Sequence, residues 1–79
     1  MEIVTTVLES ARSGIARARI MYNAYLSYSQ TIEYLEFLQG NGLLKYDARA
    51  RIYRTTEKGL KFLSASNKVN KMMGVSNSE

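Results

Sequence analysis

The sequence has 79 residues, which is enough for one small domain but not for two independent hydrophobic cores. It contains no Cys and no His, which excludes disulfides, thiolate nucleophiles, Cys- or His-based metal sites and His-based acid–base catalysis. Eleven Lys and Arg against seven Asp and Glu give a net charge of +4, which favours an anionic partner, either nucleic acid or a membrane surface.

The N-terminal third of the chain predicts two helices. Apolar residues from Ile3 to Ala11 recur at helical spacing and predict a first helix over residues 2–12, with Gly14 as its C-terminal cap. A second, shorter helix is predicted over residues 15–23 and is followed by a short turn at residues 24–25. The apolar stripe of the first helix is expected to be core.

A third helix is predicted over residues 27–39. Ser27-x-x-Gln30 has the pattern of a capping box, and Gly40-Asn41-Gly42 is expected to end the helix. One face is expected to be buried, carrying Thr31, Tyr34, Leu35 and Leu38.

Two strands and a fourth helix follow. Residues 43–46 and 51–55 predict the strands, with a four-residue loop at 47–50 between them, and the hairpin forms a wing over residues 44–55. Thr56 is predicted to cap a last helix over residues 57–73. Residues 74–79 are polar and are expected to fray.

The last helix carries an apolar seam at coiled-coil-like spacing, formed by Phe62, Ala65, Val69 and Met72. The seam can pack against the first helix of its own domain or against a second subunit. One helix in so small a body cannot easily bury Leu60, Leu63 and the seam together, so we favour a dimer interface.

The predicted order is α-α-α-β-β-α. This order predicts a mainly α fold with a small β-hairpin (α+β), a winged helix-turn-helix, as one domain over residues 1–73. The third helix is then the recognition helix.

The order and spacing of several segments are similar to those of the small archaeal winged-helix DNA-binding proteins. This family consists of predicted transcriptional regulators and has abundant chromatin-associated relatives. The resemblance covers about residues 3–70 and depends on Ile20-Met21, Leu26-Ser27, Tyr34-Leu35-x-x-Leu38, Gly42-Leu43-Leu44 and Tyr53-x-x-Thr56-x-x-Gly59-x-x-Phe62-Leu63. Two features depart from it: Ala18 stands where relatives often carry Thr, and the last helix is shorter than in the long coiled-coil members.

The resemblance implies binding of double-stranded DNA as a homodimer and regulation of transcription. It implies that the third helix enters the major groove, that the wing contacts the backbone or minor groove, and that the last helix pairs with its counterpart in the second subunit.

The candidate DNA-binding residues are Arg17, Arg19, Tyr28, Ser29, Gln30, Lys45, Arg49, Arg51 and Arg54. Residues 12–54 hold seven bases and three acids, and so carry the whole net charge. Gln30 is suited to adenine, and Ser29 to bases or phosphate. Gln30 is equally well explained by the capping box alone, and any single Arg by a solvated surface. For Arg49 and Arg51 together at the hairpin tip, DNA contact is the favoured interpretation.

The aromatic residues allow base stacking, but most are expected at core positions, namely Tyr34, Phe37 or its neighbours, Tyr53 and Phe62. Tyr28 is the aromatic residue expected to be exposed. Glu33 and Glu36 on the outer face of the third helix are best explained as solvated charges.

Three binding functions stay open. The first is a sequence-specific regulator, and the second is a chromatin-type binder of low specificity, which the absence of Lys and Arg from residues 27–39 favours. The third is a protein-interaction winged helix, which Glu33 and Glu36 favour. No enzyme, metal, cofactor or small-molecule ligand is expected, because no nucleophile–base pair, phosphate loop or pocket is readable. No membrane association is expected either. With no targeting segment visible, we expect a cytoplasmic, nucleoid-associated location.

Overall fold

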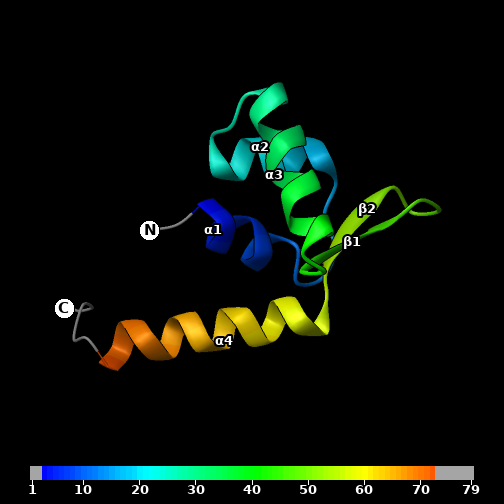
Figure 1. Cartoon of the computed structure of the whole chain (residues 1–79). Coiled ribbons are helices and arrows are strands. Elements are labelled where there is room, and N and C mark those ends of the chain that lie inside the picture. The colour runs from blue at the N-terminus through cyan, green and yellow to red at the C-terminus, as the bar shows by residue number, and fades with distance from the viewer. Residues whose placement is uncertain (1–2, 73–79) are drawn as a thin grey trace.

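Four helices and one antiparallel hairpin make up the part of the chain that the computed structural model describes, residues 3–72, with side chains up to residue 66 (Figure 1). The elements are α1 (Ile3–Ser10), α2 (Arg17–Ala24), α3 (Tyr28–Gly40), β1 (Leu44–Asp47), β2 (Ile52–Thr55) and α4 (Glu57–Met72). Figure 1 shows α1 between α4 and the pair α2 and α3, with the hairpin extending from one end of the molecule. The predicted order α-α-α-β-β-α is confirmed.

The first helix ends earlier than predicted. It stops at Ser10, and the next residues form a turn in which the Gly14 amide donates to the carbonyl of Ala11 at 3.1 Å, with Gly14 at φ 100°. The reason lies at the end of β2. The Thr55 amide donates to the Ala11 carbonyl at 3.0 Å, and the Thr55 hydroxyl donates to the Leu8 carbonyl at 2.6 Å. The carbonyls of Leu8, in the last turn of α1, and of Ala11, just after it, therefore accept from the strand.

The second helix starts later than predicted, because Ile15 belongs to the sheet. Its amide donates to the Tyr53 carbonyl at 2.9 Å and its carbonyl accepts from the Tyr53 amide at 2.8 Å. This antiparallel bridge adds a third backbone segment beside β2, and α2 begins only at Arg17. The helix ends at Ala24, where Tyr25 at φ 56° forms a left-handed cap.

The hairpin loop lies one residue further along the chain than predicted, at residues 48–51. The strands pair Leu44 with Thr55, Lys45 with Arg54, Tyr46 with Tyr53 and Asp47 with Ile52. The Asp47 carboxylate accepts from the amides of Arg49 and Ala50 at 3.0 and 3.2 Å, which fixes the turn. Arg51, predicted as strand, has φ 57° and therefore closes the loop.

The base of the hairpin is joined to the start of α4 by several polar contacts. The Thr56 hydroxyl donates to the Gly42 carbonyl at 2.7 Å and accepts from the Gly59 amide at 3.0 Å, so Thr56 is the predicted helix cap. The Thr56 amide donates to the Leu43 carbonyl at 3.0 Å. A Cβ on Gly59 would collide with the Leu43 carbonyl oxygen and the Thr55 methyl group, so only glycine allows this close approach.

One cluster of buried apolar residues connects the elements, formed by Val7, Leu8, Ala11, Ile20, Leu35, Leu38, Leu44 and Leu63. Two aromatic residues predicted in the core are exposed instead: Phe37 is 57% exposed and Phe62 is 40% exposed. Each stands one residue, about 100° of helical rotation, from a buried leucine, so its side chain lies outside the buried stripe. Tyr53 does pack against the cluster.

Candidate nucleic-acid interface

The start of α3 is held by the predicted capping box. The Ser27 hydroxyl accepts from the Gln30 amide at 3.2 Å, and the Gln30 side-chain oxygen accepts from the Ser27 amide at 3.0 Å. Thr31 is buried one turn in, where its hydroxyl donates to the Ser27 carbonyl at 2.8 Å. The side-chain oxygen of Gln30 is thus occupied. Bidentate bonding to adenine, which uses both the oxygen and the nitrogen, requires Gln30 to leave the cap.

The outer face of α3 is mostly polar and carries no Lys or Arg. Ser29, Gln30, Glu33 and Glu36 are exposed, together with Phe37. Tyr28 is exposed at the first position of the helix, at 57%, as predicted, and Tyr22 and Tyr25 are exposed further, at 74% and 93%. Tyr25 is carried outward by the left-handed turn between α2 and α3, which periodicity cannot reveal.

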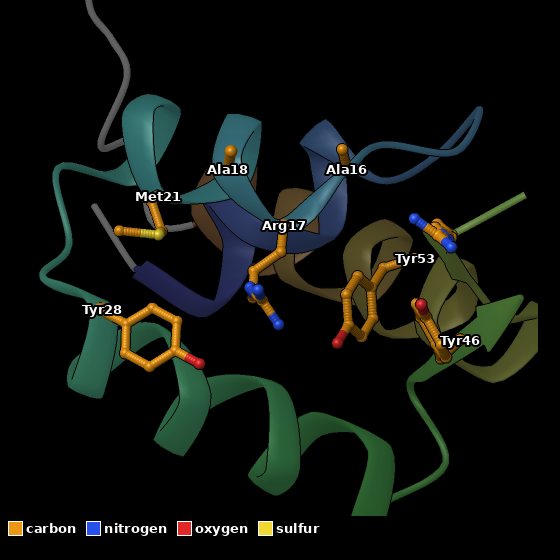
Figure 2. A pocket seen from close by; sticks show the side chains of 8 residues that line it. Ala16, Arg17, Ala18, Met21, Tyr28, Tyr46 and Tyr53 are labelled. Carbon is orange, nitrogen blue, oxygen red and sulfur yellow. The ribbon is translucent and has the colours of Figure 1, made fainter. Parts of the chain in front are cut away.

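A hollow of about 320 Å³ lies between the start of α2, the start of α3 and the hairpin. In Figure 2 the Arg17 side chain extends from α2 toward α3, with the Tyr28 ring on one side and the Tyr53 ring on the other. The Arg17 guanidinium lies 5.3 Å from the centre of the Tyr28 ring, a cation–π contact. Tyr46 and Tyr53 form the hairpin wall as a cross-strand pair, with ring centres 4.7 Å apart. We call this space the aromatic hollow.

A second hollow, of about 460 Å³, lies at the hairpin and is lined by three further basic residues, Lys45, Arg49 and Arg54, together with Asp47. Lys45 and Arg54 are opposite each other in the strand register, so their side chains share one face of the hairpin. Tyr46 and Tyr53, the next pair, project to the other face. The predicted basic residues of the wing are therefore divided between two sides, because Arg51 lines the aromatic hollow.

Two of the predicted DNA-binding arginines are less available to a partner. Arg54 makes a hydrogen bond within the protein, and Arg19 lies away from the aromatic hollow. The Arg54 guanidinium donates to the Ser13 carbonyl at 3.1 Å and so holds the turn after α1. Arg19 lies about 200° around α2 from Arg17, on the opposite edge of the helix from the aromatic hollow. It is exposed, but the fold does not bring it together with Arg17, Tyr28 and Arg51.

Most of the basic side chains near α2, α3 and the hairpin form no salt bridge with a described acidic side chain. Among the side chains of residues 3–66 the one salt bridge joins Arg12 and Glu9 at 3.8 Å, both largely exposed. The guanidiniums of Arg17 and Arg51 meet no carboxylate there. An anion could therefore bind these cations without first displacing a carboxylate.

Sequence reasoning missed the contribution of Tyr46, Tyr53 and Met21 to the aromatic hollow. Tyr46 and Tyr53 could have been paired from the alternation of the two strands, had the loop been placed one residue later. Met21 carried no such signal, because its neighbours in the hollow come from distant segments.

Other kinds of site find no support in the part of the chain that the structure describes. Its Asp and Glu residues form no group of three or more that could hold a metal ion. No helix within those residues has both the length and the apolar character needed to cross a bilayer.

The sequence model of a family described as winged helix-turn-helix matches residues 1–74. A comparison with curated proteins finds no match.

Proposed function

Because the chain belongs to the winged helix-turn-helix family, we propose that it binds double-stranded DNA as a homodimeric transcriptional regulator. Winged helix-turn-helix domains are typically DNA-binding and non-enzymatic. The observation that carries the proposal is the gathering of exposed bases, none paired with an acid among the described side chains, at the start of α2 and on the hairpin. We place the protein in the cytoplasm at the nucleoid, with the small archaeal regulators it resembles.

In the proposed complex the start of α3 enters the major groove. Tyr28 and Ser29 are exposed there and offer hydroxyls to phosphates or base edges, and Gln30 reads adenine once it leaves the capping box. The hairpin lies along the backbone or minor groove, where Arg49 and Arg51 at its tip supply charge and planar donor groups.

A chromatin-type binder of low specificity is the second candidate. It is favoured by the composition of α3, because no Lys or Arg lies on the helix and Glu33 and Glu36 occupy its outer face. Bidentate contacts of Arg or Lys to guanine, the commonest specific contacts, are not available from this helix. Competition by unrelated DNA separates the two candidates, because a specific regulator resists it and a chromatin-type binder does not.

The test of DNA binding is a fluorescence-anisotropy titration of a labelled random duplex at several salt concentrations. We expect an affinity that falls linearly on a log–log plot against salt, with a slope set by the number of phosphates contacted. Selection of preferred sites then follows, and a specific dimer should recover two half-sites related by a two-fold axis. Failure to bind even at low salt would contradict the proposal and favour the protein-interaction function instead.

The proposed dimer uses the outward face of α4. Leu63 is buried against the core, whereas Phe62 and Ala65 are exposed, about 100° and 160° around the helix from Leu63. A large exposed aromatic residue next to a small one on a helix is suited to packing against a second helix. The side chains of the other two seam residues, Val69 and Met72, lie outside the described ones.

The test of the dimer is sedimentation equilibrium of the Phe62→Ser variant. We expect the variant to sediment as a monomer at concentrations where the parent protein is a dimer. Leu60→Ser is the matched control, since Leu60 is exposed to a similar degree on α4 but lies about 160° around the helix from Phe62. A Phe62→Ser protein that remains dimeric would remove the seam from the interface.

A further inference from the structure

The aromatic hollow is an open depression with apolar and aromatic walls, lined mostly by exposed residues. Its volume of about 320 Å³ lies near the lower end of the range for ligand pockets, about 300–1,000 Å³. Ala16, Ala18 and Met21 form one apolar wall on α2, and the rings of Tyr28, Tyr46 and Tyr53 form the others. Figure 2 shows the tyrosines coming from two elements, α3 and the hairpin, with Arg17 between them.

The polar groups of the hollow are free to bind a ligand. Within residues 3–66 the hydroxyls of Tyr28, Tyr46 and Tyr53 make no hydrogen bond, and neither Arg17 nor Arg51 contacts a carboxylate. No acidic residue lines the hollow, so its two guanidiniums give it a positive charge. Apolar and aromatic walls with a few converging polar groups are typical of a ligand pocket.

From these features we propose that the aromatic hollow binds a small planar aromatic carboxylate. The carboxylate is recognised by the guanidiniums of Arg17 and Arg51, whose planar donor groups match it. The aromatic ring packs against the tyrosine rings and the Met21 thioether, which favour flat apolar groups. A lone phosphate uses the two charges but gains nothing from the alanine and methionine wall. The wall therefore favours an organic anion over a phosphate of the DNA backbone.

The position of the hollow gives this ligand a regulatory effect, and this part of the inference rests on the proposed function. Arg17, Tyr28 and Arg51 are among the residues proposed to contact DNA. A carboxylate held between them neutralises charge that DNA would use and occupies the space beside the start of α3. The ligand and DNA therefore compete, and a rising concentration of the acid releases the protein from DNA.

The first experiment is isothermal titration calorimetry of the full chain, without DNA, using three probes. 2-Naphthoate supplies ring and charge, 2-naphthamide supplies the ring without the charge, and inorganic phosphate supplies charge without the ring. We expect 2-naphthoate to bind at least tenfold more tightly than either of the others. Equal binding of phosphate and 2-naphthoate would assign the hollow to a backbone phosphate and overturn the proposal, as would no binding of 2-naphthoate.

Three variants locate the bound acid. Arg17→Gln and Arg51→Asn each remove one guanidinium, and Asn tolerates the left-handed backbone at residue 51. We expect each to weaken 2-naphthoate binding about tenfold, as for loss of a charge-assisted hydrogen bond. Ala18→Leu fills the hollow without changing charge, and should abolish binding of 2-naphthoate while leaving phosphate unaffected.

The matched control is Arg19→Gln, which removes the same charge from the opposite edge of α2 and should leave 2-naphthoate binding unchanged. If Arg19→Gln weakens binding as much as Arg17→Gln does, the acid responds to overall charge and the site assignment is wrong.

Competition with DNA is measured separately, by adding 2-naphthoate to the complex with a labelled duplex. We expect 2-naphthoate to lower the anisotropy of the complex and 2-naphthamide, at the same concentration, to have little effect. Calorimetry without DNA tests the pocket even if the chain fails to bind DNA, so failure of the ligand site and failure of the proposed function give different results.

Discussion

The two ends of the hairpin use their side chains in different ways. At the base, Thr55 donates a buried hydrogen bond to α1, and Thr56 connects the loop before β1 to the cap of α4. At the tip, Arg49 and Arg51 are exposed, and neither side chain contacts a carboxylate among residues 3–66. Residues at the base are committed to folding, whereas those at the tip remain available to a partner. Substitutions at the base should change stability and those at the tip should change binding.

The largest effect is expected at the base, from Gly59→Ala. The added methyl group would meet the Leu43 carbonyl and the Thr55 methyl group, so α4 must move away from the hairpin base. We expect a loss of about 3 kcal/mol in the free energy of unfolding, measured by urea denaturation. Gly40→Ala is the control, because a Cβ at Gly40 meets no atom within 4 Å and should not destabilise the protein. Equal stability of the two variants would contradict the close approach.

The next largest effect is expected at the tip, from Arg49→Ala combined with Arg51→Asn. If the wing contacts DNA, removal of two free cations should lower affinity by about 2 kcal/mol at low salt and make the log–log salt slope shallower by roughly two. Thermal unfolding should be nearly unchanged. Lys61→Ala combined with Lys68→Ala on α4 removes the same charge away from the wing and should have a smaller effect on the slope. Unchanged affinity in the wing variant would exclude the wing from DNA binding.

Thr55→Val should destabilise the base of the hairpin less than Gly59→Ala does. The substitution keeps the β-branched shape but removes the hydroxyl that donates to the Leu8 carbonyl, leaving that carbonyl with one partner fewer. We expect a loss of about 1–2 kcal/mol in the free energy of unfolding, with unchanged DNA affinity per folded molecule. Thr55→Ser keeps the donor and serves as its control. A larger loss in the Ser variant than in the Val variant would show that packing of the methyl group, not the hydrogen bond, is what matters there.

Local sequence patterns predicted most of the fold but not the contacts between distant segments. The capping box at Ser27 and the cap at Thr56 depend on residues three positions apart, and both were found. The end of α1 and the bridge at Ile15 depend on β2, far along the chain, and both were misplaced. Phe37 was assigned to the core because apolar character alone does not say which side of a helix is covered.

The candidate site was predicted only in part, for the same reason. The basic residues of the wing could be identified from the sequence. Their division between two faces depends on a one-residue shift of the loop, set by the Asp47 carboxylate and the left-handed backbone of Arg51. The aromatic hollow forms where three segments distant in the chain meet, so local patterns could not predict it.

The smallest effect is expected at the cross-strand pair Lys45 and Arg54, which lies next to the base of the hairpin. Arg54→Ala removes an exposed hydrogen bond to the Ser13 carbonyl and should lower the free energy of unfolding by about 0.5 kcal/mol. Lys45→Ala has no such bond to lose and should leave stability unchanged. Both should weaken DNA binding at low salt if this face lies along the backbone. Since Arg54 then acts in folding and in binding, its effect on affinity must be compared at equal folded fraction. If Arg54→Ala alters stability but not DNA affinity, Arg54 acts in folding, like the residues at the base of the hairpin, and not in DNA binding.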